Sequence, residues 1–170
     1  MSGIISIETL LFNVRLSVRY HHRRRAFFDT LNLAAHACSV IFGSAAIAAL
    51  LKSSQDLVLY ASAIVTVMAT LNLVLRSSER ARLHHDLAKR FMTLEQKLLP
   101  AAQSEFAQLY AEKLSIEAEE PAPLQVLAVL CHNDQIGAEG IKPERRIALR
   151  WWQRLFAQLI DLPPAPLPHA

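Results

Sequence analysis

The 170-residue chain contains few glycines and few charged residues. Gly occurs only 4 times, and no Asn-Gly or Asp-Gly pair is present to form a two-residue β-hairpin turn. Charged residues make up 19% of the chain, whereas a soluble domain carries about 25%. Apolar residues make up 52%, with Leu and Ala prominent. This composition argues against a sheet-rich fold and predicts an all-α protein that enters a membrane.

Enzyme motifs are also absent from the sequence. There is no Gly-rich phosphate loop, Cys-x-x-Cys pair, His-Glu-x-x-His or Gly-x-Ser-x-Gly. The two cysteines, Cys38 and Cys131, lie in an apolar run and in a separate predicted helix, so they do not indicate a disulfide framework. A single Cys131-His132 pair is weak evidence for chemistry and is typical of a buried thiol. We expect no enzymatic activity, no metal and no cofactor.

Two long stretches carry no charged residue. They read LNLAAHACSVIFGSAAIAALL over residues 31–51 and LVLYASAIVTVMATLNLVL over residues 57–75. A helix as long as the first stretch measures about 31 Å, close to the thickness of a bilayer core. Because only residues 52–56 separate the stretches, the second must return antiparallel to the first. We predict a transmembrane hairpin over residues 31–76, with spans at 31–51 and 57–75.

The alternative is that both stretches are core helices of a soluble bundle. A soluble helix of this length usually carries a charged face, and neither stretch has one. The first stretch also begins far from the start of the chain, so we expect a permanent anchor instead of a cleaved leader.

The basic residues predict the orientation of the hairpin. Residues 15–25 and 76–90 hold ten of the eighteen Lys and Arg, while the connecting loop holds only Lys52. The positive-inside rule therefore places both termini in the cytoplasm. We expect six arginines near the spans to attract anionic lipid headgroups in preference to nucleic acid: Arg23, Arg24, Arg25, Arg76, Arg80 and Arg82.

The flanking segments have heptad patterns. Apolar residues recur at spacings of three and four in two seams, Ile4, Ile7, Leu11, Val14 and Val18 before the hairpin and Leu83, Leu87, Phe91, Leu94 and Leu98 after it. We predict that the seams meet in a cytoplasmic helical bundle. The domains would be a basic helix at 1–30, the hairpin, a helical region at 77–162 and a disordered Pro-rich tail at 163–170. A last helix over 143–162, carrying Trp151 and Trp152, would close the bundle or lie on the membrane.

Polar and small residues form a stripe on each span. Ala35, Ser39 and Gly43 recur every four residues in the first span, and Ser62, Thr66 and Thr70 do so in the second. Such surfaces let helices approach closely. They would join the two helices of one hairpin, or meet neighbouring hairpins and line a pore. The candidate pore-lining or helix-contact residues are His36, Ser39, Gly43, Ser62, Thr66 and Thr70.

Two histidine pairs flank the hairpin at similar distances along the chain. His21 and His22 precede the first span, and His84 and His85 follow the second. An antiparallel hairpin brings them to one level, where four imidazoles would bind a metal or respond to acid. The neighbouring arginines repel a cation, so we favour a structural role for these histidines.

The layout resembles the SLATT family of two-transmembrane effector domains in bacterial conflict systems. The resemblance lies in the arginine-rich first helix RLSVRYHHRRRAFFDT, the two close spans, the amphipathic helix after them and the segment from EAEEP to CHNDQIGAEG. It covers about residues 10–160 and brings no catalytic residues. It implies an inner-membrane effector that assembles and permeabilises the membrane when an associated sensor protein detects infection, often through a nucleotide signal.

The leading hypothesis is thus a homo-oligomeric membrane protein whose hairpins form a pore or leak in antiviral defence. The second is a membrane anchor whose helical bundle recruits a cytoplasmic partner without forming a pore. The third is a soluble helical bundle that binds nucleic acid or another helix.

Overall fold

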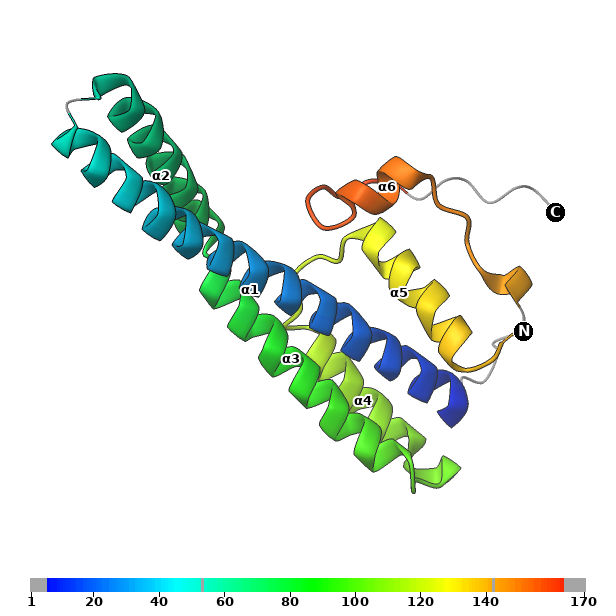
Figure 1. Ribbon diagram of the computed structural model, residues 1–170. Coiled ribbons are helices and arrows are strands. Elements are labelled where there is room, and N and C mark those ends of the chain that lie inside the picture. The colour runs from blue at the N-terminus through cyan, green and yellow to red at the C-terminus, as the bar shows by residue number, and fades with distance from the viewer. Residues whose placement is uncertain (1–5, 53, 142, 164–170) are drawn as a thin grey trace. The chain divides into compact units, whose positions relative to one another are not determined.

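The structure is a computed structural model that describes residues 6–52, 54–141 and 143–163, and all of its regular elements there are helices (Figure 1). In chain order they are α1 (Ile7–Leu51), α2 (Gln55–Leu75), α3 (Ser77–Leu98), the 3-10 helix η1 (Gln103–Glu105), α4 (Phe106–Glu117), α5 (Gln125–Ala138), the 3-10 helix η2 (Pro143–Arg145) and α6 (Trp151–Phe156). The all-α prediction is confirmed. The predictions for Ile4 and for residues 164–170 lie outside the described residues.

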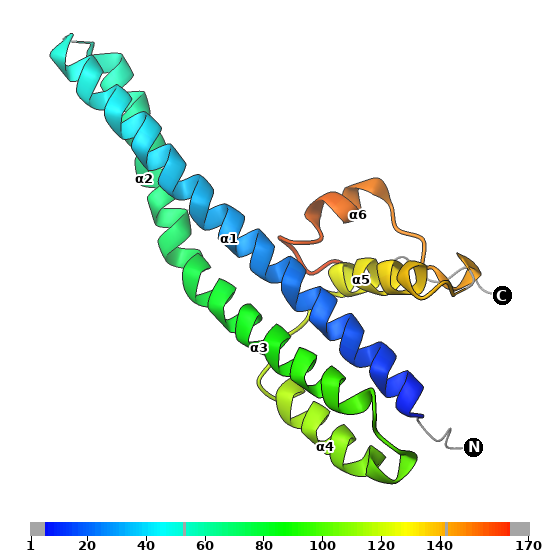
Figure 2. The same ribbon diagram turned by 60° about the horizontal axis from the view of Figure 1, so that its bottom comes forward.

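The chain divides into two compact units. One, here called the hairpin unit, is residues 25–83; the other, the core unit, combines residues 1–24 with residues 84–170. In the hairpin unit, α2 runs back along the second half of α1 (Figures 1 and 2). The prediction of two long apolar helices, each of spanning length, is confirmed.

The two helices of the hairpin unit bury a regular seam. In α2 the least exposed positions recur at spacings of three and four: Val58, Ala61, Val65, Met68, Asn72 and Leu75. The buried residues of α1 in this unit are Phe28, Ala35 and Ala49, which are separated by multiples of seven. This spacing is the one with which two antiparallel helices pack side by side. Small side chains at Ala35, Ala49 and Ala61 allow a close approach.

Arg76 ends α2 in a left-handed conformation, with φ 47° and ψ 47°. Its backbone N–H bonds the carbonyl of Leu73 at 3.2 Å. A left-handed residue cannot continue an α-helix, so α2 and α3 are separate elements. The charge-free stretch therefore ends at a true helix end.

In the core unit, the two predicted seams share one hydrophobic cluster. Val14 of α1 is buried with four seam residues of α3, namely Leu87, Phe91, Leu94 and Leu98. Leu10 is fully buried in the same cluster although it lies outside the predicted seam, and Leu83 is 40% exposed. Leu109 and Ile116 of α4 complete the cluster. Residues from both predicted seams therefore pack in one cluster, although Leu10 joins them and Leu83 does not.

A second hydrophobic cluster attaches α5 to α1. It contains Tyr20, Val126, Leu127, Cys131 and Ala157, so the segment around α6 also contributes to it. The Tyr20 hydroxyl accepts a hydrogen bond from the N–H of Leu124 at 3.0 Å, directly before α5. Burial raises the pKa of Tyr20, which keeps this hydroxyl neutral.

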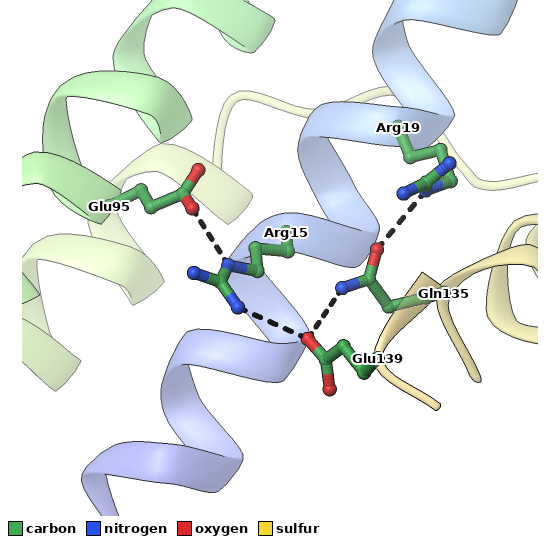
Figure 3. A network of polar contacts seen from close by, with 5 residues as sticks. All are labelled: Arg15, Arg19, Glu95, Gln135 and Glu139. Carbon is green, nitrogen blue, oxygen red and sulfur yellow. Dashed lines mark hydrogen bonds and ion pairs between the residues drawn. The ribbon is translucent and has the colours of Figure 1, made fainter. Parts of the chain in front are cut away.

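A polar network beside these clusters joins α1, α3 and α5 (Figure 3). Arg15 donates to Glu95 at 2.7 Å and to Glu139 at 3.3 Å, and these carboxylates raise its pKa. Gln135 accepts from Arg19 at 3.1 Å and donates to Glu139 at 2.6 Å. Two arginines of the predicted basic helix are therefore fixed by protein partners.

The predicted helix over 143–162 is wrong, because residues 146–150 are not helical. Asn133 of α5 binds both backbone groups of Ile147: it donates to the carbonyl at 2.7 Å and accepts from the N–H at 2.8 Å. These tertiary bonds hold the segment outside a helix as far as Arg150, which is extended and directly precedes the short α6. Side-chain bonding of the backbone has overridden the helical pattern.

We predict that Asn133→Ala destabilises the core unit by about 1–3 kcal/mol, because it leaves both polar groups of Ile147 unpaired. The free energy of unfolding is measurable in detergent by tryptophan fluorescence, since both tryptophans lie in α6. Asn13→Ala is the control, because no hydrogen bond holds the Asn13 side chain among the described residues. Equal stability of the two variants would contradict this role of Asn133.

Candidate functional site: the outer face of the hairpin unit

The polar stripe of α2 points away from the hairpin seam. Ser62, Thr66 and Thr70 are all exposed, so they do not join α2 to α1. The Ser62 hydroxyl donates to the carbonyl of Leu59 at 3.0 Å, and that of Thr66 donates to the carbonyl of Ser62 at 2.8 Å. Satisfying these donors within the helix lowers the cost of placing hydroxyls in an apolar medium. The stripe is left available to another helix.

The stripe of α1 is divided between the seam and the outer face. Ala35 is buried, Ser39 is half-buried and donates to the carbonyl of Ala35 at 2.9 Å, and His36 is exposed. A Cβ added to Gly43 would meet nothing within 4 Å. Close packing inside this chain therefore does not require glycine at position 43.

A pair of asparagines crosses the hairpin seam. The amide of Asn72 in α2 donates to the side-chain oxygen of Asn32 in α1 at 3.1 Å. The side-chain oxygen of Asn72 is buried and, among the described residues, has no hydrogen-bond partner. Polar pairs in apolar seams fix the register of two helices at a cost in stability. The Asn32–Asn72 hydrogen bond therefore ties α1 and α2 at a defined level.

Most of the six arginines predicted to bind headgroups have protein partners. Arg23 pairs with Asp134, Arg24 is buried and donates to the carbonyl of Gln158 at 2.7 Å, and Arg25 donates to Asp29 at 3.3 Å. Arg76 pairs with Glu79 at 3.7 Å, and the Arg80 guanidinium lies 5.7 Å from the centre of the Phe28 ring. Arg82 is exposed.

The structure brings together two of the four histidines. His21 and His84 are buried, and their Nδ1 atoms lie 2.9 Å apart. His21 Nε2 lies 3.0 Å from Glu120, and the ring stacks on Phe91 with 5.7 Å between centroids. One proton occupies an N···N hydrogen bond, so the contact cannot persist with both rings doubly protonated. His22 is exposed, and no group of three or more His, Cys, Asp or Glu side chains in residues 6–52, 54–141 and 143–163 is arranged so that it could hold a metal ion.

We predict that His21→Ala destabilises the core unit by about 2–4 kcal/mol. The substitution opens a cavity against Phe91 and leaves His84 and Glu120 without this partner. The matched control is His22→Ala, which removes the exposed neighbouring ring. Thermal unfolding in detergent, followed by circular dichroism, compares them. If His22→Ala were as unstable as His21→Ala, the buried His21–His84 pair would contribute no more to stability than an exposed histidine.

The four residues Cys131 to Asp134 have separate structural roles. Cys131 is fully buried, and burial raises the pKa of its thiol to about 11. The His132 ring meets Phe12 edge-on at 5.6 Å, while Asn133 and Asp134 bind Ile147 and Arg23. A protonated, enclosed thiol is a poor nucleophile. This arrangement supports the interpretation of Cys131 as a core residue.

The raised pKa predicts slow alkylation of Cys131. In a Cys38→Ser background at pH 8, we expect iodoacetamide to react about 100-fold more slowly than with the unfolded chain, because a shift from 9.0 to about 11 lowers the thiolate fraction by that factor. The stabilisation from the neutral thiol is present below pH 9 and is lost as the pH rises to 11. Equal rates in the folded chain and in denaturant would refute the assignment.

Comparison with known protein families, with characterised proteins and with solved structures finds no significant match. The candidate site therefore depends on the chain's own geometry.

Sequence reasoning missed several residues that the structure singles out. The seam of α2 is hidden because nearly every residue in that run is apolar, so the sequence does not show which face is covered. Glu95, Gln135 and Glu139 each look like ordinary surface residues in the sequence, yet they hold Arg15 and Arg19. No local signal would have paired them.

Proposed function

We propose that this chain is a two-span protein of the bacterial inner membrane, with both termini in the cytoplasm, whose hairpins self-associate and permeabilise the membrane as an effector of a conflict or antiviral system. One observation carries the proposal: the helices of the hairpin unit leave large apolar side chains uncovered. Of the most apolar windows of α1 and of the stretch Gln55–Leu98, only 11% and 6% of residues are buried.

The exposed apolar residues lower the free energy of the spans in lipid relative to water. Thirteen Leu, Ile and Val side chains of the predicted spans are exposed. Their exposed fractions range from 39% at Ile64 to 84% at Leu51. At about 0.3–0.6 kcal/mol each they favour insertion by about 4–8 kcal/mol. A core helix of a soluble protein buries such residues within its own fold, so this exposure speaks against the soluble-bundle hypothesis.

The outer polar face supports self-association. Ser62, Thr66 and Thr70 lie on the exposed side of α2, and Gly43 has free space around it. In lipid, small and hydroxyl side chains are the ones that bring helices of separate molecules together. Ser62 also lines a groove of about 500 Å³ near the loop, beside Leu50 and Val58. The resemblance to SLATT effectors extends this association to permeabilisation.

The competing proposal is a membrane anchor that recruits a partner. It is favoured by the core unit, which has two hydrophobic clusters of its own and offers a folded surface for an associated protein. An anchor needs bilayer insertion but no contact through the outer face of α2.

We predict that the chain stays with the membrane during carbonate extraction and depolarises bacterial cells when it is expressed, as followed with a potential-sensitive dye. The double variant Thr66→Leu, Thr70→Leu should insert normally but associate about sevenfold more weakly, from two contacts of about 0.6 kcal/mol each, and should lose depolarisation.

The control is Val67→Leu with Val74→Leu, which alters exposed residues of α2 without removing a polar group. Depolarisation that survives in both double variants, or is absent from the unmodified chain at high expression, would favour the anchor. Release of the chain by carbonate would refute both membrane proposals.

A further inference from the structure

The segment around α6 presents an apolar face to the outside of the core unit. Trp151 is 78% exposed, Leu155 is 65% exposed and Leu159 is 62% exposed, and these residues recur every four positions. Leu159 and Ile160 both donate backbone bonds to the carbonyl of Phe156, so the chain turns onward after α6. Exposed aromatic and aliphatic side chains gathered on one face mark an interaction surface.

The opposite side of this segment is anchored in the core unit. Ala157 is buried in the cluster with Tyr20 and α5. Gln153 is also buried; it accepts from the N–H of Arg150 at 2.9 Å and donates to the carbonyl of Pro163 at 3.1 Å. These contacts fix which side of the segment faces inward. The outward direction of Trp151 and Leu155 is therefore a property of the fold.

Four arginines of this segment have no acidic partner among the described residues. Arg145, Arg146, Arg150 and Arg154 make no ion pair with a described residue. Arg146 and Arg154 line a groove of about 720 Å³ with Asn133, Gly137 and Asp134, and Asp134 is paired with Arg23. No carboxylate of the described residues forms an ion pair with these four arginines. Guanidinium groups bind phosphate oxygens in a fork.

The segment around α6 contacts a residue of α1 that lies close in sequence to the first predicted span. Arg24 donates to the backbone carbonyl of Gln158 at 2.7 Å and to its side-chain oxygen at 3.1 Å. Arg24 lies on α1 only seven residues before Leu31, where the first predicted span begins.

We propose that residues 145–160 form a peripheral contact with anionic phospholipid, in which Trp151, Leu155 and Leu159 enter the headgroup–acyl boundary and Arg150 and Arg154 bind headgroup phosphates. Tryptophan suits this boundary because its ring is apolar and its N–H is polar. Nucleic acid would match the arginines but not the aliphatic residues, whereas a lipid surface matches both. The inference rests on bilayer insertion in the proposed function and is independent of self-association.

The two tryptophans of the chain are Trp151 and Trp152, so a Trp152→Phe variant reports on Trp151 alone. This full-length variant is reconstituted into vesicles of phosphatidylcholine with or without phosphatidylglycerol. We expect blue-shifted Trp151 emission that lipids brominated near the headgroup quench, more strongly with phosphatidylglycerol. Arg150→Gln with Arg154→Gln should weaken docking by about fivefold for each arginine. The control is Arg90→Gln with Lys97→Gln, which removes two positive charges that Glu119 and Glu112 already pair, and it should leave the quenching unchanged.

Carbonate extraction separates failure of this inference from failure of the proposed function. A chain that stays in the vesicles while its Trp151 is unquenched overturns the lipid contact alone. Quenching of Trp151 that is equally strong with and without phosphatidylglycerol overturns the role of the arginines. Trp151 emission that responds to an added oligonucleotide, or to protein concentration in detergent, without quenching by lipid assigns the face to nucleic acid or to a second copy and also overturns the proposal.

Discussion

Continuous backbone hydrogen bonding along α1 is the constraint on which the other features depend. One helix of 45 residues supplies both the first part of the core unit and the first half of the hairpin. A helix satisfies its own polar backbone groups, so the same element suits a protein interior, water or hydrocarbon. What changes along α1 is the side chains, from the buried Leu10 and Val14 to the uncovered Val40 and Ile41.

The charged residues of α1 follow the same division between the core unit and the hairpin unit. Basic residues of α1 before the hairpin are held by partners in the core unit, as Arg15 is by Glu95 and Arg19 by Gln135. The cost of burying part of an arginine is offset there by charged or amide oxygens. The arginines beside α6 make no ion pair with a described residue, so they are available to an external anion.

The sequence was sufficient for the helical class and for the two long apolar helices, because each depends on composition or on periodicity within one element. It was insufficient where a single distant side chain decides the outcome. Asn133 breaks a segment whose own pattern is helical, and His21 selects His84 although His22 and His85 have the same spacing in the sequence. In the spans, uniform apolarity conceals which face is covered, so the outward direction of Thr66 required coordinates.

The left-handed Arg76 also resets the phase of the buried face. The covered positions of α2 end at Leu75, and the next buried residues are Ser77 and Ala81. In an unbroken helix, the side chains of Leu75 and Ser77 would point about 160° apart, because two residues rotate the direction by about 200°. The single backward-wound residue removes this mismatch, so residues on both sides of it face inward. Arg76 therefore separates the heptad register of α2 from that of the start of α3. A change of register in one helix does not oblige the other helix to change its buried positions.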